Sequence, residues 1–138
     1  MKKVMVFGTF DPLHTGHHFL FSAARKFGDF LIVVVARDKT VQTVKGHETQ
    51  ESEKQRLLNV KAAAGVDLAV LGQLKDVYSV IEEHKPDVIC LGYDQFAFTE
   101  RLPAELERRK ITAEIIRLPA FKEDVYKSSL LKSRQKSF

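Results

Sequence analysis

The chain has a single cysteine, no tryptophan and no long apolar run. Cys90 has no second thiol to pair with, and its apolar surroundings favour a buried strand residue over a nucleophile. The longest strong apolar run, 31–36, ends at Arg37 and is too short to span a bilayer. Residues 1–3 lead into an apolar run without a secretory signal pattern. These absences predict a cytoplasmic protein that does not associate with membranes.

A strong excess of charge of one sign is also missing. Lysine and arginine number 22 against 18 aspartates and glutamates, which gives a formal net charge of +4. The basic residues are dispersed except in the segment 127–136, and such a segment is usually a solvated helix face. Nucleic-acid binding normally shows a clustered basic patch with aromatic residues or a known fold signature. The charge balance therefore predicts an anionic small-molecule substrate and no nucleic-acid partner.

The sequence does contain a regular alternation of apolar runs and helical patterns. Near-continuous apolar runs predict strands at 3–8, 30–36, 68–72, 88–92 and 113–118. Helical patterns lie between them, at 16–27, 52–64, 77–84 and 99–109. The length of 138 residues suits one hydrophobic core. We therefore expect an α/β fold, a single Rossmann-like domain over residues 1–138 with a doubly wound, parallel, five-stranded sheet and helices on both faces.

Residues 39–50, which follow the second expected strand, show no apolar periodicity. The segment is polar and contains Gly46. A loop of this length in a compact domain often serves as a lid over a site, although a plain surface loop is the simpler alternative. We expect an irregular loop here, and a lid is the functional interpretation.

The most informative segment is GTFDPLHTGHH at residues 8–18, which joins the first expected strand to the first expected helix. Open α/β sheets bind phosphates at such junctions, because the helix N-terminus offers unpaired N–H groups and a partial positive charge. Gly16 leaves room for a phosphate beside the main chain, and the imidazoles of His14 and His17 can donate hydrogen bonds to it. Histidines at a helix start are also often ordinary polar loop residues. Their spacing here matches neither a zinc finger nor a helical zinc-binding pair, so we expect no protein-bound metal.

This segment closely resembles the motif of the cytidylyltransferase-like nucleotidyltransferases. Four further stretches match that family in the same order along the chain: GDFLIVVVARD at 28–38, EKQR at 53–56, GYDQ at 92–95 and SS at 128–129. The resemblance extends over residues 3–132. It implies the HUP type of nucleotidyltransferase fold. It also implies an enzyme that transfers a nucleotidyl group from a nucleoside triphosphate to a phosphorylated small molecule and releases pyrophosphate.

The resemblance implies roles for the residues around the first motif. His14 and His17 would contact the triphosphate and stabilise the pentacoordinate transition state. Lys45, with Lys39 as the weaker candidate, would contact a phosphate. Catalysis of this kind is chiefly positioning and charge stabilisation, and Mg²⁺ or another divalent cation would be held mainly by the substrate phosphates. The nucleotide-binding residues implied in this loop are Gly8, Thr9, Phe10 and Gly16.

Three polar residues near this loop have two interpretations each. Asp11 orients a histidine or holds a turn, since Asp-Pro commonly initiates turns. Asp38 faces the acceptor or caps a turn. Arg56, which the resemblance makes a phosphate ligand, would otherwise belong to a solvated, charged helix face.

Two later stretches complete the implied binding site. Asp94, with Gly92 and Gln95 in the same base-binding loop, would accept a hydrogen bond from an exocyclic amine or a ribose hydroxyl. Ser128 and Ser129 would point hydroxyl groups at the β- or γ-phosphate, or only cap a helix.

The expected substrates depend on two short stretches. GYDQ at 92–95 and VARD at 35–38 are closer to the archaeal-type FAD synthetases than to the glycerol-3-phosphate cytidylyltransferases. The resemblance therefore favours transfer of AMP from ATP to FMN. The alternative is CTP with glycerol 3-phosphate or another alcohol phosphate, because adenine and cytosine both carry an exocyclic amine. A non-catalytic nucleotide-binding module is a further alternative, and the commonly dimeric state of the relatives implies a homodimer.

Overall fold

A computed structural model describes residues 1–92, 95 and 99–119 of the chain. Its centre is one sheet of five parallel strands in the order β3-β2-β1-β4-β5. The strands are β1 (Lys3–Gly8), β2 (Phe30–Val35), β3 (Leu68–Leu71), β4 (Val88–Leu91) and β5 (Glu114–Arg117). The expected parallel sheet is confirmed, and each predicted strand agrees with the structure to within one residue at either end.

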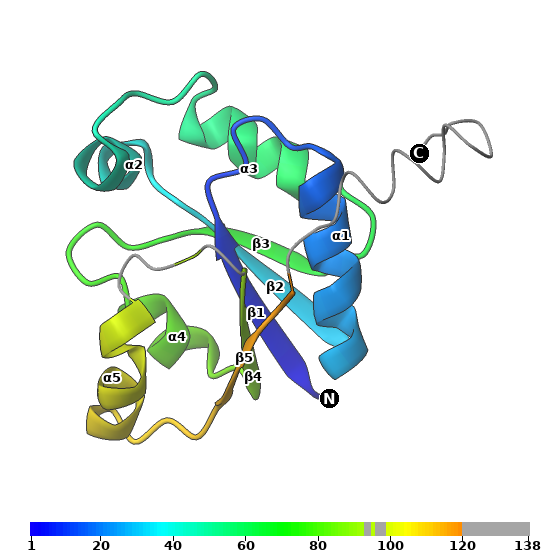
Figure 1. Cartoon of the computed structure of the whole chain (residues 1–138), viewed down its shortest axis with the longest axis vertical. Helices are drawn as coiled ribbons and strands as arrows, with labels where there is room; N and C mark the ends of the chain where they lie inside the picture. Colours follow the sequence, from blue (N-terminus) through cyan, green and yellow to red (C-terminus); the bar gives the residue numbers. More distant parts are fainter. Residues whose placement is uncertain (93–94, 96–98, 120–138) are drawn as a thin grey trace.

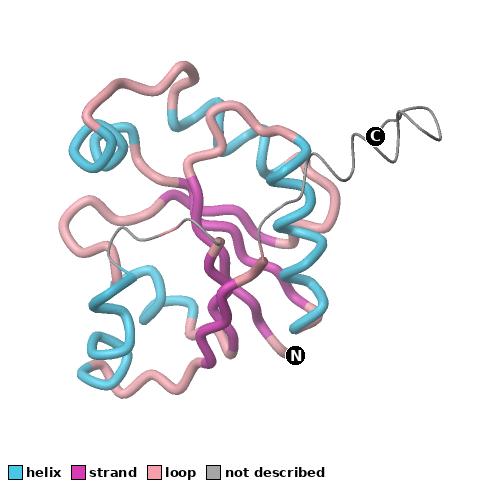
Figure 2. The backbone as a smooth tube through the Cα atoms, in the orientation of Figure 1, coloured by secondary structure: helices cyan, strands magenta, loops and turns pink. Residues whose placement is uncertain are grey.

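Helices cover both faces of this sheet, as Figures 1 and 2 show. On one side lie α1 (Thr15–Ala24), which continues into the 3₁₀ turn η1 (Arg25–Phe27), and α3 (Glu53–Lys61). On the other side lie α4 (Ser79–His84) and α5 (Leu102–Arg108), which follows the 3₁₀ turn η2 (Thr99–Arg101). In the part of the chain that the structure describes, no helix is long and apolar enough to cross a membrane.

The central strand β1 shows why the apolar runs are continuous. Val4 and Val6 pack into the core layer beneath α1 and α3. Met5 and Phe7, which point to the opposite face, pack into the layer beneath α4 and α5. Since successive side chains of a strand alternate between faces and both faces are covered, every position of β1 favours an apolar residue.

The order of the strands decides where a ligand can bind. The chain runs from β1 outward through β2 to β3, and then crosses to the other side of β1 to form β4 and β5. The carboxyl ends of β1 and β4 therefore lie at a topological switch point, where open α/β sheets form their ligand crevice. The loop that carries the histidines leaves β1 at this edge.

The prediction of an irregular loop over residues 39–50 was wrong. A helix, α2 (Asp38–Lys45), occupies the first half of this segment. Val41 is its one buried residue, so the helix lacks the apolar stripe by which a sequence pattern would have indicated it. It ends at Gly46, whose φ of 77° and N–H bond to the Gln42 carbonyl form a left-handed C-cap.

Candidate active site

The loop after β1 is shaped by one aromatic residue that turns back into the core. Phe10 has a φ of 58° and is almost fully buried, with its ring packed against Phe21. A Cβ at Gly8 would lie 2.5 Å from the tip of the Phe10 ring, so this position has room only for glycine. The side chain of Phe10 therefore belongs to the core. Only the main chain of Phe10 can therefore contact a nucleotide.

The two motif histidines cap the first turn of α1 reciprocally. His14 is the N-cap residue, and its Nδ1 accepts the N–H of Gly16 at 3.0 Å. The Nδ1 of His17 accepts the N–H of His14 at 3.1 Å, which closes a capping box. The two rings stack with their centroids 3.8 Å apart, and the ring of His17 also meets the edge of Phe10. The helix start thus fixes the position of both imidazoles.

This capping arrangement also fixes the proton positions of the rings. Because each Nδ1 accepts a main-chain N–H, each neutral imidazole carries its proton on Nε2, where it can donate to a ligand. Burial lowers the pKa of His17 to about 4, and neighbouring positive charge adds to the effect. That charge comes from His14, His18 and Lys45. His17 is therefore neutral at pH 7, and Lys45 at the end of α2 lies near enough to act on it.

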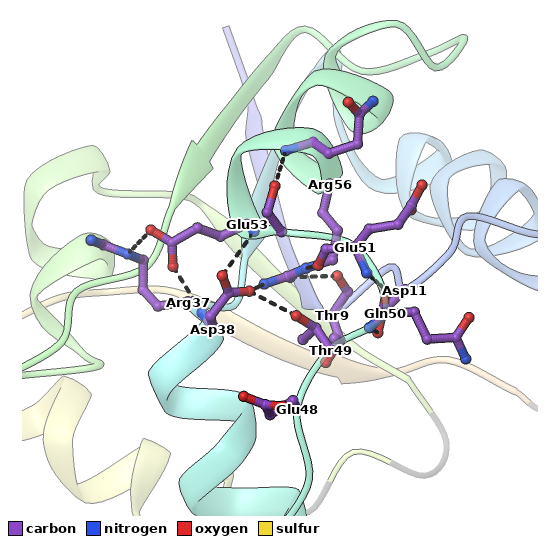
Figure 3. A network of polar contacts seen from close by, with 12 residues as sticks. Thr9, Asp11, Arg37, Asp38, Glu48, Thr49, Gln50, Glu51, Glu53 and Arg56 are labelled. Atoms are coloured by element: carbon purple, nitrogen blue, oxygen red, sulfur yellow. Dashed lines mark hydrogen bonds and ion pairs between the residues drawn. The ribbon is translucent and has the colours of Figure 1, made fainter.

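Arg56 lies beneath the loop and is the only charged side chain among the described residues that is fully buried. Its Nη1 donates to the Thr9 carbonyl at 2.8 Å and its Nη2 to Asp38 at 2.6 Å (Figure 3). Its Nε donates to the Glu51 carbonyl at 3.1 Å. The alternative interpretation of Arg56 as part of a solvated face is wrong, because the guanidinium is enclosed and donates to three acceptors. The structure thus gives Arg56 a clamping role, and a phosphate contact would have to compete with these acceptors.

Asp38 and Glu53 cap the starts of α2 and α3 for each other. The Asp38 carboxylate accepts the Glu53 N–H at 3.1 Å, and the Glu53 carboxylate accepts the Asp38 N–H at 2.8 Å (Figure 3). Partial burial would raise the pKa of Asp38, but its hydrogen bonds outweigh this and lower it. The donors are Arg56, the Glu53 N–H and Thr49. Of the two interpretations of Asp38, capping is the one that its contacts support.

Asp11 joins the histidine loop to the segment before α3. Its carboxylate accepts the main-chain N–H groups of Gln50 at 2.6 Å and Glu51 at 2.8 Å (Figure 3). The carboxylate therefore makes neither of the two contacts suggested for it, to a histidine or within its own turn. Sequence reasoning also missed Arg37, Thr49 and Glu53, because their partners lie 11–35 positions away along the chain.

A shallow, open pocket lies on the α2 side of this network. It has a volume of about 570 Å³ and is lined by Asp38, Lys39, Gln42, Glu48, Thr49 and Ser52. Its lining is polar and contains none of the motif histidines. It therefore offers room for part of a ligand beside the histidine loop, rather than the reaction centre itself.

On the other side of the histidine loop, Gly92 follows β4 and contacts Gln95. The Gln95 side chain accepts the Gly92 N–H at 2.7 Å and donates to the Phe7 carbonyl at 2.7 Å. The amide of Gln95 is thus engaged with main-chain groups at the ends of β4 and β1. Three predicted binding residues, Asp94, Ser128 and Ser129, lie outside the described residues.

The described residues contain no group of three or more histidine, cysteine, aspartate or glutamate side chains that could hold a metal ion. The carboxylates of Asp11, within the histidine loop, and of Asp38, which shares Arg56 with that loop, are engaged by N–H groups and by Arg56. These residues fit a divalent cation such as Mg²⁺ that is bound mainly by the phosphate oxygens of the substrate and by water, because Mg²⁺ commonly keeps such ligands.

Comparison with known families and proteins agrees with this geometry. A family model described as cytidylyltransferase-like matches residues 5–134. An FAD synthase of Ferroglobus placidus is 46% identical over 124 residues, which cover 90% of this chain and 80% of that protein. An FAD synthase of Methanosarcina barkeri is 42% identical over 125 residues, which cover 89% of this chain and 87% of that protein.

Solved structures give the same picture of the fold. A lipopolysaccharide core biosynthesis protein from Thermoplasma volcanium superposes with a TM-score of 0.83 at 38% identity, covering 88% of this chain and 99% of that one. A pantoate-beta-alanine ligase from Francisella tularensis, at 16% identity, has a TM-score of 0.63 and covers 97% of this chain and 69% of that one. The second match concerns the fold alone.

Proposed function

Because this chain belongs to the cytidylyltransferase-like family and is a nucleotidyltransferase, we propose that it is an FAD synthase, which transfers AMP from ATP to FMN. Two findings support the proposal. Relatives named FAD synthase are 39–46% identical over about nine tenths of the chain. The observation that carries the chemistry is the stacked His14–His17 pair at the start of α1, with both Nδ1 atoms engaged and both Nε2–H groups left as donors.

The reaction needs no covalent intermediate on the protein. An oxygen of the FMN phosphate attacks the α-phosphorus of ATP, the bond to the β-phosphate oxygen breaks, and pyrophosphate leaves in line with the attack. Catalysis is then a matter of alignment and of donors aimed at the charge that develops on the phosphoryl oxygens. The pre-set imidazoles of His14 and His17 supply such donors without reorganisation.

The surrounding residues bind and orient the triphosphate. The N-terminus of α1 attracts its negative charge, and the main chain of Gly8, Thr9, Phe10 and Gly16 approaches it closely. Lys45, whose charge already acts on His17, contacts a phosphate from the end of α2 and makes that helix a lid. Mg²⁺ or another divalent cation, held mainly by the phosphates, offsets charge on the leaving pyrophosphate.

The remaining predicted residues complete this proposal. Arg56 and Asp38 hold the loop and the lid in place, and by the family resemblance Gly92, Asp94 and Gln95 would contact the nucleobase and Ser128 and Ser129 a phosphate. The enzyme is cytoplasmic, and it acts as a homodimer on a nucleoside triphosphate and a phosphorylated small molecule.

The first test is pyrophosphate release with Mg²⁺, crossing ATP and CTP against FMN, glycerol 3-phosphate and no acceptor, with chromatographic detection of FAD. We expect release and FAD with ATP plus FMN only. Pyrophosphate release with CTP and glycerol 3-phosphate instead would show that the enzyme is a cytidylyltransferase. The absence of pyrophosphate release with every pair of substrates would overturn the proposal.

Single His14→Asn and His17→Asn variants test the role of the histidines. The asparagine Oδ1 is bonded to Cγ, as the histidine Nδ1 is, and can still accept the capping N–H at either position, but the Nε2–H donor is lost. We expect turnover to fall by about 100- to 1,000-fold, as for the loss of one donor to a transition-state oxyanion, with the melting temperature nearly unchanged. Retained turnover in both variants would exclude the imidazoles from the chemistry.

A further inference from the structure

The helix α2 is anchored at its first residue and exposed over its second half. Val41 is its only buried residue, and every later residue of the helix is exposed. At its start, the Asp38 N–H donates to the Glu53 carboxylate at 2.8 Å. The Asp38 carboxylate accepts further bonds from Arg56 and Thr49 (Figure 3). A helix that is held in this way can pivot about its first turn.

The open pocket of about 570 Å³ leaves room for such a pivot. Three of its lining residues belong to α2 and three to the segment between α2 and α3. Lys45, the last residue of α2, lies about 10 Å along the helix axis from Asp38, at a rise of about 1.5 Å per residue. A rotation of about 10° at the start of the helix therefore moves Lys45 by about 2 Å. Such a shift is enough to break a hydrogen bond, whose length varies by only about 0.5 Å.

The Glu53 carboxylate fixes the angle of α2 with both of its oxygens. Its Oε1 accepts the main-chain N–H of Asp38, and its Oε2 accepts the Nε of Arg37, the N-cap residue of α2, at 3.1 Å (Figure 3). The Nη1 of Arg37 also donates at 3.3 Å to the carbonyl of Gly72, the first residue after β3. A bond to a main-chain N–H fixes the helix itself, whereas the bonds to the Asp38 carboxylate fix a side chain that can still rotate. Glu53 thus joins the start of α2 to α3 and, through Arg37, to the edge of the sheet.

The far end of α2 acts on the histidine pair. Burial, the charges of His14 and His18, and the charge of Lys45 lower the pKa of His17 to about 4. The Lys45 ammonium is therefore close enough to the imidazoles to meet the same triphosphate. The angle that is set at the start of the helix decides where this charge lies.

We propose that Glu53 is a positioning residue, because its carboxylate sets the angle of α2 and with it the point at which Lys45 meets the triphosphate. This inference rests on the proposed function and deepens it by naming the residue that acts through Lys45. A merely structural cap would act on the activity independently of Lys45. A residue that acts through Lys45 has no further effect once Lys45 is gone.

The test is a double-mutant cycle of Glu53→Ala and Lys45→Met, in which kcat and KM for ATP are measured at saturating FMN, well below the melting temperatures. Glu53→Gln is the conservative variant, since its amide oxygen can still accept the main-chain N–H at the start of α2. Asp67→Ala is the matched control. The Asp67 carboxylate also accepts a main-chain N–H, that of Leu31, and pairs with Arg25, but it precedes β3 and so lies at the opposite edge of the sheet.

We expect Lys45→Met to lower kcat/KM for ATP about tenfold, the effect of one hydrogen bond to a charged group, and Glu53→Ala to lower it about fivefold. The double variant should match Lys45→Met alone, whereas independent effects would multiply to about fiftyfold. Glu53→Gln should recover part of the loss, and Asp67→Ala should lower the melting temperature without changing kcat/KM. Independent effects in the double variant, an unchanged kcat/KM in either single variant, or an equal loss in Asp67→Ala overturns the inference.

The same cycle in equilibrium binding separates this inference from the proposed function. Calorimetry with Mg²⁺ and without FMN measures the affinity for ATP and for CTP. If wild type makes no FAD, the proposed function fails. The inference still stands if each single variant weakens the binding of the nucleotide that wild type binds and the double variant binds no more weakly than Lys45→Met. Independent losses, an unchanged affinity in either single variant, or no binding of either nucleotide by wild type overturns it.

Discussion

Two shielded arginines, Arg56 and Arg109, organise opposite sides of the sheet in different ways. Arg56, fully buried on the α3 side, donates to two main-chain carbonyls and one carboxylate. Arg109, at the end of α5 with 9% of its side chain exposed, donates to three carboxylates. These are Asp76 after β3, Glu82 of α4 and Glu105 of α5. The first arginine holds a loop at the ligand edge, and the second holds two helices together.

The acceptors explain this difference. A main-chain carbonyl at Thr9 cannot move without moving the loop that carries the histidines, so the bond from Arg56 fixes the geometry of the site. The carboxylates around Arg109 are side-chain groups of α4, α5 and the segment before α4, and none of them belongs to the histidine loop. The hydrogen bond from Arg109 also lowers the pKa of Asp76. We therefore expect the loss of Arg56 to affect activity and stability, and the loss of Arg109 to affect stability alone.

Arg56→Met should have the largest effect. It leaves the Asp38 charge without its buried partner and two carbonyls without donors, at a cost of about 3–4 kcal/mol in the free energy of unfolding. Turnover per folded molecule should fall about 100-fold, since a displacement of about 1 Å at a reaction centre is enough for that. Urea denaturation and steady-state kinetics on the same samples measure the two effects.

Arg56→Lys is the control for this variant. It keeps the charge but cannot reach three acceptors in the fixed geometry of the guanidinium, so it should be intermediate in both measurements. Unchanged turnover in folded Arg56→Met would contradict the idea that this residue positions the loop.

Arg109→Met should have a smaller effect that is limited to stability. It removes ion pairs with partly exposed carboxylates, and the melting temperature should fall by about 5 °C. At temperatures below the melting transition, kcat and KM should remain those of wild type. A loss of turnover in this variant, measured well below its melting temperature, would show that the α4–α5 face is coupled to the site after all.

A further effect concerns pH and again separates the two sides. The pKa of His17 is about 4 in the folded chain and 6.5 when unperturbed, so between these values the unfolded chain holds more protons. The contribution of His17 to stability should therefore be nearly complete above pH 6.5 and be lost as the pH drops to 4. The two pKa values alone correspond to about 3 kcal/mol, and solvent screening of the partly exposed imidazole reduces the expected loss to about 2 kcal/mol. Asp76 and Glu105, whose pKa values are lowered, contribute to the pH dependence only below the ordinary carboxylate range.

Chemical denaturation at several pH values measures this dependence in three proteins. His17→Asn should lose the slope between pH 6.5 and 4, whereas Arg109→Met should keep it. A wild-type slope that persists in His17→Asn would assign the effect to another group.

Much of the fold was predictable because its signals are local. Each strand of the sheet is a short apolar run with its own sequence pattern, and the histidine motif is contiguous from Gly8 to His18. The helix α2 was missed because it buries only Val41 and is held at its start by Glu53, fifteen residues away. Propensity and periodicity do not detect a helix whose main support is a distant carboxylate.

The parallel α/β fold and the pair of imidazoles at the first strand–helix junction could be predicted from the amino-acid sequence, because both depend on residues that are close together along the chain. The three-dimensional arrangement was needed to show that Arg56 clamps the loop at Thr9, 47 positions away, that Asp11 holds the segment before α3, and that Arg117 donates to the Gly92 carbonyl after β4. From the sequence alone, a long polar side chain has many possible acceptors. The order of the strands in the sheet selects among them, because it brings particular strand ends together.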